Sequence, residues 1–272
     1  MLNYNLYKFY KISVNKKLGQ HFLLDFILAK LIVNSIGELR FGTTLEIGPG
    51  FGILTQALLL EDTNNLIAIE KDIRFVKFLQ PLVKKFPGRF LILESDALDL
   101  DFLSLSPFTC RIVSNLPYNI STTLIINWLK IGVFFDNFIL MLQKEVAQRL
   151  IALPCSKSYG RLSVLSQFLS IGVLLFNVVP DVFIPPPKII SSVVSLTTSK
   201  ELLSLRKCTQ NDIEIITNIL FAQRRKMLRV SLKNLILSPI SLLLKAKILP
   251  NLRVENLTIK DFDLLIKLIN SF

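Results

Sequence analysis

Short apolar runs alternate with stretches of helical spacing over the first two hundred positions of the chain. The runs are rich in Val, Ile, Leu and Phe, as is typical of strands buried on both faces of a parallel sheet. Strands that take turns with helices favour an α/β fold with a doubly wound, mostly parallel sheet. We expect seven strands, at 43–47, 65–70, 90–94, 110–114, 136–142, 171–179 and 191–197, and helices at 25–37, 52–60, 72–86, 121–131 and 143–153.

The pattern changes after residue 200, where strand signals almost disappear. Helical periodicity predicts helices at 211–222, 224–236, 240–248 and 258–270. We therefore expect an α/β domain over 1–200, which begins with a basic arm at 1–20, and a small all-helical domain over 201–272.

Composition narrows the class of protein. Apolar residues make up 51% of the chain, which excludes disorder because so many side chains can repay the ordering entropy. Three widely spaced Cys and a single His argue against a disulfide scaffold and against a His/Cys metal site. A reducing cytoplasm is the simplest location. The uncharged run 162–180 is interrupted by polar residues, so we expect no membrane association.

The charge balance gives the first functional indication. The chain has 32 Lys+Arg against 20 Asp+Glu, a net charge of +12. A protein this basic attracts polyanions such as nucleic acid, although a basic composition can also serve solubility alone.

A glycine-rich turn follows the first expected strand and opens a helix. Gly48, Gly50 and Gly52 let the backbone turn sharply and approach a ligand closely. Glu70 ends the next expected strand, where a carboxylate can accept from both hydroxyls of a ribose. Asp96 follows the third strand and could accept from an adenine amino group.

The spacing of this turn distinguishes between nucleoside cofactors. Ile53 stands where a dinucleotide-binding fingerprint needs a third glycine, so the spacing argues against NAD as the cofactor. Acidic residues suit a nucleoside with a cationic tail, which is S-adenosylmethionine. The alternative is a strand–helix turn without a ligand, but it leaves unexplained why acids end successive strands.

A second motif, Asn-x-Pro-Tyr, follows the fourth expected strand. The Asn115 side-chain oxygen and the Pro117 carbonyl can hold the two N–H groups of a ring-conjugated amine, and Tyr118 can stack on an extruded base. Such a nitrogen is a poor nucleophile, so we expect the rate to come from positioning and charge complementarity. Taken alone, the motif could be an ordinary turn.

These motifs and several others occur in one order along residues 16 to about 257. The segments are 17–23 (KLGQHFL), 46–50 (EIGPG), 115–122 (NLPYNIST), 141–147 (MLQKEVA), 159–164 (YGRLSV) and 183–188 (FIPPPK). Together they resemble the KsgA family of ribosomal small-subunit RNA adenine dimethyltransferases.

The resemblance implies a Rossmann-like methyltransferase domain that uses S-adenosylmethionine. Its expected substrate is two adjacent adenosines in the 3′-terminal hairpin of 16S ribosomal RNA, methylated on their exocyclic amines during small-subunit assembly. Phe183 would close on the free face of the target base, opposite the Asn115, Pro117 and Tyr118 motif. The implied cofactor contacts are His21, Leu23, Gly48, Gly50, Glu70, Asp96 and Asn115.

Two other functions stay open at this point. Erythromycin-resistance enzymes share the Asn-x-Pro-Tyr motif and methylate large-subunit RNA, although they generally lack segments such as 159–164. A non-catalytic RNA-binding assembly factor could use the same surface. The presence of all the inferred methyl-transfer residues favours an enzyme, and we expect it to be a monomer.

Candidate RNA contacts lie in two basic segments. In the predicted helix 224–236, cationic side chains form one stripe, and Leu228, Leu232 and Leu235 form another that packs. We expect contacts to RNA phosphates, with salt-dependent affinity, although a solvated basic face is a common alternative. The candidate residues are Lys16, Lys17, Arg224, Arg225, Lys226 and Arg229.

Overall fold

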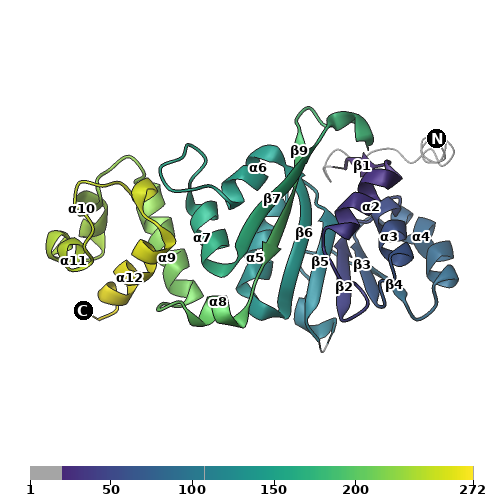
Figure 1. The fold of residues 1–272 in the computed structure, drawn as a ribbon, viewed down its shortest axis with the longest axis horizontal. Helices are drawn as coiled ribbons and strands as arrows, with labels where there is room; N and C mark the ends of the chain where they lie inside the picture. The colour runs from purple at the N-terminus through teal and green to yellow at the C-terminus, as the bar shows by residue number, and fades with distance from the viewer. Residues whose placement is uncertain (1–19, 107, 272) are drawn as a thin grey trace. The chain divides into compact units, whose positions relative to one another are not determined.

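The computed structural model describes residues 20–106 and 108–271, and within them the main sheet has seven strands in the order β4-β3-β2-β5-β6-β9-β7 (Figure 1). Strands β2 to β6 pair in parallel with their neighbours, and β9 is antiparallel to β6. The predicted seven-stranded, mostly parallel sheet is therefore confirmed. The strands are β2 (Thr43–Ile47), β3 (Leu66–Glu70), β4 (Phe90–Glu94), β5 (Cys110–Asn115), β6 (Phe135–Gln143), β7 (Ile171–Val178) and β9 (Ser191–Thr197).

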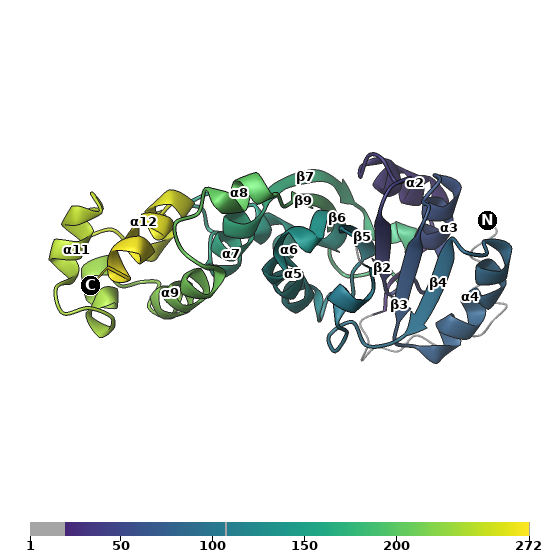
Figure 2. The ribbon, with the colours of Figure 1, turned by 90° about the horizontal axis from the view of Figure 1, so that it is seen from below.

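Helices follow the strands as the alternation predicted. Helix α2 packs on α3, and α4 packs against β3 and β4 (Figure 2). Carboxylate caps start two of them, because Asp25 accepts from the Leu28 N–H and Asp72 accepts from the Arg74 N–H. The helices are α2 (Phe26–Asn34), α3 (Ile53–Leu60), α4 (Ile73–Lys85), α5 (Ser121–Lys130), α6 (Lys144–Leu150) and α7 (Arg161–Leu169), with short 3₁₀ turns η2 (Phe102–Ser104), η3 (Gly132–Phe134) and η4 (Pro180–Val182).

A small second sheet was not predicted. β1 (Phe22–Leu23) pairs antiparallel with β8 (Phe183–Ile184), which brings Leu23 opposite Phe183. Strands of two residues carry no periodicity, and their partners lie far apart in the sequence. This pairing holds residues 20–23 beside the carboxyl ends of the main sheet, where they line a cavity described below.

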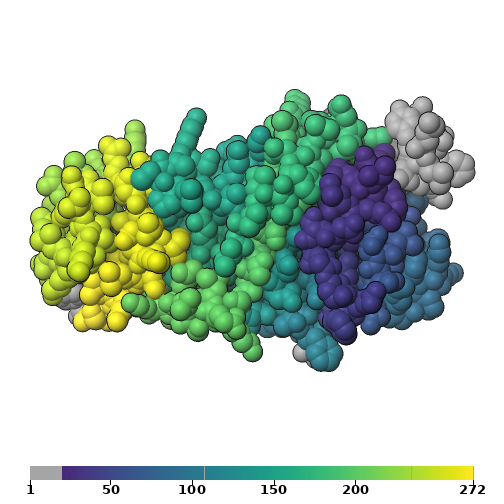
Figure 3. All heavy atoms as spheres, viewed as in Figure 1, coloured from purple at the N-terminus to yellow at the C-terminus, as the bar shows by residue number. Residues whose placement is uncertain are grey.

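The chain forms two compact units. The first ends at Ala147 and resumes over Val173–Thr197, whereas the second contains Gln148–Gly172 and continues from Thr198 onward. This division begins its helical part close to the expected boundary at residue 200, and it differs from the expected domains in grouping 148–172 with that part. Inside the second unit, Arg161 of α7 pairs with Glu214, and the Tyr159 hydroxyl donates to the Leu257 carbonyl. Within each unit, side chains fill the gaps between elements (Figure 3).

The C-terminal part is helical, as predicted, except around residue 225. Its elements are α8 (Lys200–Ser204), α9 (Gln210–Ala222), α10 (Leu228–Ser231), η5 (Leu232–Asn234), α11 (Pro239–Lys245), η6 (Val254–Asn256) and α12 (Ile259–Ile269). α9 and α12 begin with reciprocal capping boxes, Thr209 with Asp212 and Thr258 with Asp261.

The predicted helix 224–236 is wrong at its start. Residues after Ala222 form a turn, and Met227 is extended and bridges to Arg253. Leu228 N–H then donates to the Leu252 carbonyl, so contacts with the chain near residue 252 replace a continuous helix. Leu228 and Leu232 are fully buried, which confirms them as packing residues.

Candidate active site

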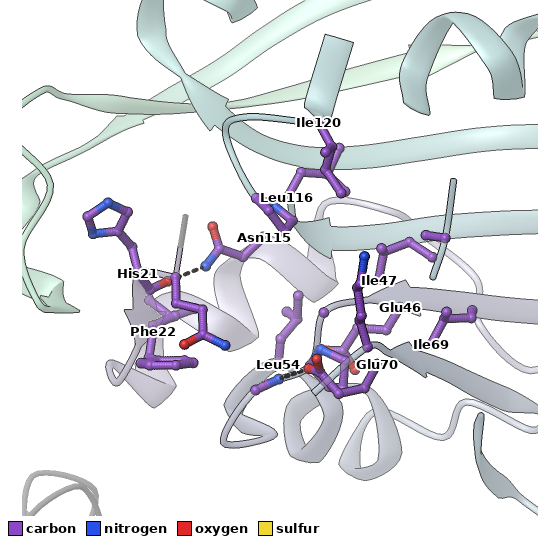
Figure 4. A pocket seen from close by; sticks show the side chains of 18 of the residues that line it. His21, Phe22, Glu46, Ile47, Leu54, Ile69, Glu70, Asn115, Leu116 and Ile120 are labelled. Carbon is purple, nitrogen blue, oxygen red and sulfur yellow. Dashed lines mark hydrogen bonds between the residues drawn. The ribbon is translucent and has the colours of Figure 1, made fainter. Parts of the chain in front are cut away.

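A cavity of about 230 Å³ lies at the carboxyl ends of β2, β3, β4 and β5 (Figure 4). One water needs on the order of 10–15 Å³ of such space, so the cavity is large enough for an organic ligand. The four carboxyl ends of parallel strands that approach it are where doubly wound sheets bind ligands. It is lined by every sequence-predicted cofactor residue, and by Asn115, Pro117 and Tyr118, but not by Phe183.

The glycine turn forms one wall of the cavity. Gly48, Gly50 and Gly52 have φ values of 67°, 53° and 71°, which side-chain-bearing residues rarely adopt. A Cβ on Gly50 would lie 2.8 Å from the Phe22 ring, and one on Gly52 would lie 2.5 Å from Leu79 Cδ2. The turn therefore needs glycine for its backbone conformation and for its close packing.

Glu70 lies at the end of β3, facing the turn. Its Oε2 accepts from the Gly50 N–H at 3.2 Å, and its Oε1 accepts from the Asp72 N–H at 2.9 Å. Burial raises the pKa of Glu70 to about 7, although these N–H groups oppose the shift. The carboxylate is thus fixed in place, and each oxygen keeps a lone pair for a hydroxyl donor.

Glu46, the fourth of the five residues of β2, is a site residue whose functional role was not predicted from the sequence. It is 2% exposed, lines the cavity, and its Oε2 has no hydrogen-bond partner within the described chain. Burial, and then the charge of Glu70, raise the pKa of Glu46 to about 8. An acid inside the otherwise uncharged strand TTLEI was the available signal, because burying a carboxyl costs free energy unless it has a partner or a function.

Asp96 lies just after β4 at the cavity rim. Its Oδ1 accepts from the Leu98 N–H at 3.0 Å, and its Oδ2 accepts from the Lys71 ammonium. The Lys71 contact lowers the pKa of Asp96, so the side chain is an ionised acceptor. Lys71 is a rim residue that the sequence analysis did not single out.

Asn115 ends β5, and its amide orientation is set by the N-terminal segment. Asn115 Nδ2 donates to the His21 carbonyl at 3.0 Å, which leaves the Oδ1 atom as an acceptor (Figure 4). The Pro117 carbonyl instead accepts from the Ile120 and Ser121 N–H groups at the start of α5. The expectation that the Pro117 carbonyl receives an amine N–H stays a prediction, and two backbone N–H groups already bond this carbonyl here.

The Leu116 carbonyl is the alternative acceptor in this turn. Leu116 lines the cavity, and no donor among the described residues bonds to its carbonyl. It lies directly after Asn115 in the chain, so the motif still offers two neighbouring acceptors.

Tyr118 has an aromatic neighbour, although not the expected one. The His21 and Tyr118 rings stack at 5.4 Å between centroids, whereas Phe183 of β8 is 1% exposed and belongs to a hydrophobic core cluster that also contains Leu23. Phe183 therefore does not line the cavity here, and the closure of its ring on a base stays a prediction. The Tyr118 hydroxyl lies 2.6 Å from Ser191 Oγ, and burial raises the pKa of Tyr118.

The candidate RNA-binding residues differ in whether their side chains already bond to other parts of the protein. Arg224 donates to Glu255 at 2.8 Å and is committed inside the second unit. Arg225 and Lys226 are exposed and make no ion pair with any described residue. The exposed Arg229 guanidinium donates to Met227 Sδ and makes no ion pair with a described residue. Lys16 and Lys17 lie outside the described residues.

Two further properties concern the described residues as a whole. No three His, Cys, Asp or Glu side chains among them come together as a metal site requires. None of their helices has the length and apolar character needed to cross a membrane.

A doubly wound sheet with acids at the ends of successive strands, beside an Asn-x-Pro-Tyr turn, defines a Rossmann-like methyltransferase. The sequence model of the family described as ribosomal RNA adenine dimethylase matches residues 11–271. The chain therefore belongs to the ribosomal RNA adenine dimethylase family.

Individual relatives agree with this assignment. The chain is 42% identical to "Ribosomal RNA small subunit methyltransferase A" of Azorhizobium caulinodans, over 92% of this chain and 87% of the relative. It is 43% identical to the protein of the same name from Paramagnetospirillum magneticum, over 92% and 88% of the two chains.

Solved structures share the fold at lower identity. A dimethyladenosine transferase from Plasmodium falciparum superposes with a TM-score of 0.78 at 23% identity, over 92% of this chain and 98% of that one. The 23S rRNA methyltransferase ErmE superposes with a TM-score of 0.69 at 21% identity, over 92% and 99%. At these identities, the superpositions support the fold alone.

Proposed function

We propose that this protein transfers methyl groups from S-adenosylmethionine to the exocyclic amines of two adjacent adenosines in the 3′-terminal hairpin of 16S ribosomal RNA, within the small subunit. The observation that carries the proposal is the juxtaposition of the Glu70 carboxylate and the Asn115 amide in one cavity. Family membership and the names of the relatives support the choice of ribosomal RNA as substrate.

The cavity fits the proposed cofactor. Glu70 offers two fixed carboxylate oxygens to the ribose hydroxyls, and Asp96 offers an ionised acceptor to the adenine amino group. Glu46 adds a further carboxyl to this lining. Its raised pKa keeps it protonated near neutral pH in the cofactor-free protein, and a positive charge nearby would favour its ionised form. These acids suit a positively charged nucleoside and disfavour a dinucleotide with its anionic pyrophosphate.

The chain's contribution to chemistry is positioning. S-adenosylmethionine, when bound, supplies a methyl group on positively charged sulfur, and the C–S bond breaks as the amine nitrogen bonds the methyl carbon. Asn115 Oδ1 and the Leu116 carbonyl accept the two amine N–H groups and direct the nitrogen lone pair. The product ammonium is acidic enough to lose its proton to water, so no residue is assigned as a general base.

Tyr118 gives the target base a stacking surface at the mouth of this turn. Such stacking is worth about 1–3 kcal/mol per base and helps to offset the cost of extruding the base from its helix. The aromatic ring lies one residue beyond Pro117, beside the acceptors that would hold the amine.

RNA binding is assigned to Arg225, Lys226 and Arg229 of the second unit, together with Lys16 and Lys17. The first three are exposed cations, which can pair with phosphates without first breaking an internal ion pair. Arg224 is left out of this set because Glu255 already holds it.

Transfer of tritiated methyl groups to under-methylated ribosomal subunits tests the proposal. We expect label in small subunits, on two adjacent N6-dimethylated adenosines identified by mass spectrometry of the RNA. Label confined to large subunits would instead assign the erythromycin-resistance activity, whose example ErmE shares this fold. Subunit binding without any transfer would assign a non-catalytic assembly factor. A monomeric state and a cytoplasmic location stay predictions.

A further inference from the structure

We propose that His21 and Ser191 are positioning residues that hold the Tyr118 ring from one face and from its hydroxyl, so that a target base stacks only on the opposite face. This inference rests on the proposed function, because it assigns how the stacking ring is oriented for methyl transfer. It gives His21 a role toward the substrate side of the site rather than the cofactor side.

Ser191 fixes the far end of Tyr118. The two hydroxyl oxygens are 2.6 Å apart, and Ser191 is fully buried at the first position of β9. Strand β9 pairs with β6 along seven residues, so Ser191 is part of a rigid element. A buried hydroxyl that bonds the tyrosine hydroxyl restrains the ring against swinging about χ1. The hydroxyl oxygen lies on the χ2 axis, so rotation of the ring about χ2 is restrained by the stack on His21 instead.

His21 covers one face of the same ring. The two rings lie 5.4 Å apart at 27°, within the range of offset stacking. Figure 4 shows the imidazole directed away from Glu46 and Glu70. His21 Nδ1 lies 2.8 Å from the Pro185 carbonyl, and since a carbonyl only accepts, this nitrogen carries the proton.

The position of His21 also links both parts of the motif. Its backbone carbonyl orients the Asn115 amide, and its ring backs Tyr118. His21 itself is held beside β1 and β8, whose pairing brings Pro185 within reach. One residue from the start of the chain thus sets the relative geometry of the amine acceptor and the stacking ring.

A competing explanation is that His21 occupies the base position and must leave before the base enters. The hydrogen bond to Pro185 and the stack on Tyr118 both oppose such a movement. The two explanations predict opposite effects of removing the ring. Loss of a positioning ring slows transfer at saturation, whereas loss of a competing ring improves base capture and lowers KM for the subunit.

Variants of His21 separate the ring from its hydrogen bond. His21→Phe keeps a ring to stack on Tyr118 but loses the donor to Pro185, and His21→Asn keeps a donor but loses the ring. All variants retain the backbone carbonyl that bonds Asn115. We expect kcat at saturating cofactor and subunit to fall about five- to tenfold in His21→Asn and to stay within about threefold of the parent in His21→Phe.

Ser191→Ala and Ser192→Ala form a matched pair for the hydroxyl contact. Both serines are fully buried neighbours on β9 with one side-chain hydrogen bond each, but Ser192 bonds Asn177 at 2.8 Å. We expect Ser191→Ala to lower kcat about three- to tenfold and Ser192→Ala to leave it unchanged. Calorimetric Kd for S-adenosylmethionine should stay within about twofold in all four variants.

Equal kcat for Ser191→Ala and Ser192→Ala would overturn the proposal. The proposal would also fail if kcat were as low in His21→Phe as in His21→Asn, or if the variants weakened only the binding of S-adenosylmethionine. A lower KM for the subunit in His21→Asn would contradict it as well. If the unmodified protein transfers no methyl group to small subunits, the proposed function itself fails. Failure of the proposed function can be told apart from failure of the His21 and Ser191 proposal, because the tests of the latter all require a measurable rate for the unmodified protein.

Discussion

The acidic cavity of the first unit and the basic segment 225–229 of the second unit use charge in opposite ways. Glu46 and Glu70 are buried, and both carboxyl pKa values are raised because the charged form loses its hydration. Arg225 and Lys226 are exposed and without ion pairs among the described residues, so their charge stays available to a polyanion. Charge taken out of water can orient a small ligand, whereas charge left in water attracts a large one.

The two regions also differ in how they are built. The cavity collects its residues from the ends of several strands and from residues 20–23, so its geometry depends on the whole sheet. The basic segment is continuous in sequence and depends on local structure near Met227. Substitutions in the cavity should therefore change chemistry or cofactor binding, and those in the basic segment should change affinity for RNA.

The largest expected effect is that of Asn115→Ala on methyl transfer. Removing the Oδ1 acceptor leaves the amine nitrogen poorly oriented, and we expect kcat to fall at least about 100-fold. Single-turnover transfer of labelled methyl groups measures this, with circular dichroism as the check on folding. If kcat fell less in Asn115→Ala than in the variant with Arg225 and Lys226 changed to Glu, the contrast drawn between the cavity and the basic segment would be wrong.

Glu70→Ala should weaken cofactor binding. Loss of hydrogen bonds to a charged group is worth roughly 1.5–3 kcal/mol, so we expect Kd for S-adenosylmethionine to rise about 10- to 100-fold. The matched control is Glu94→Ala, because Glu94 is the register partner of Glu70 on β4 but is exposed and outside the cavity. Equal calorimetric titrations for the two variants would refute the ribose role of Glu70.

Reversing both charges in Arg225→Glu, Lys226→Glu should weaken subunit binding about tenfold. If both side chains meet phosphates, the slope of log K against log salt should shrink by roughly 1.4–1.8. Lys260→Glu with Lys267→Glu is the control, since these exposed cations lie on α12 of the same unit. A salt slope that is unchanged by the first pair would leave these side chains as a solvated surface.

Buried carboxyls make the cofactor-free protein lose stability as the pH rises. Glu46 and Glu70 keep protons in the folded state up to pKa values of about 8 and 7, whereas the unfolded chain releases them near 4.5. The folded state thus binds more protons between these limits, and the free energy of unfolding falls by up to about 1.4 kcal/mol per pH unit for each group.

Glu46→Gln sharpens that test. The uncharged side chain removes the Glu46 contribution, so urea unfolding at pH 5.5, 6.5 and 7.5 should give a flatter dependence on pH than the parent. Parallel curves for the parent and the variant would show that Glu46 does not titrate as its burial indicates.

Particular residues show how far the sequence could be read. The seven strands and the Gly48–Gly52 turn were predicted because their signals are local: continuous apolar runs, and glycines where a strand meets a helix. The helix across 224–227 was predicted wrongly, since its local spacing is helical and only the contact of Met227 with Arg253 shows otherwise. The role of Glu46 was missed because an acid in a strand reveals its burial only once both sheet faces are covered.

The sequence by itself determined the α/β alternation, the acids at successive strand ends and the motif that places Asn115 beside a tyrosine. Only the tertiary structure decided which atoms of these residues remain available. It committed the Pro117 carbonyl to α5, placed Phe183 in the core and set His21 against Tyr118. The physical reason is that most of these contacts join segments far apart in the sequence, such as His21 with Asn115 (94 residues) and with Pro185 (164 residues). Even the local bond from the Ser121 N–H to the Pro117 carbonyl depends on where α5 begins in the folded chain.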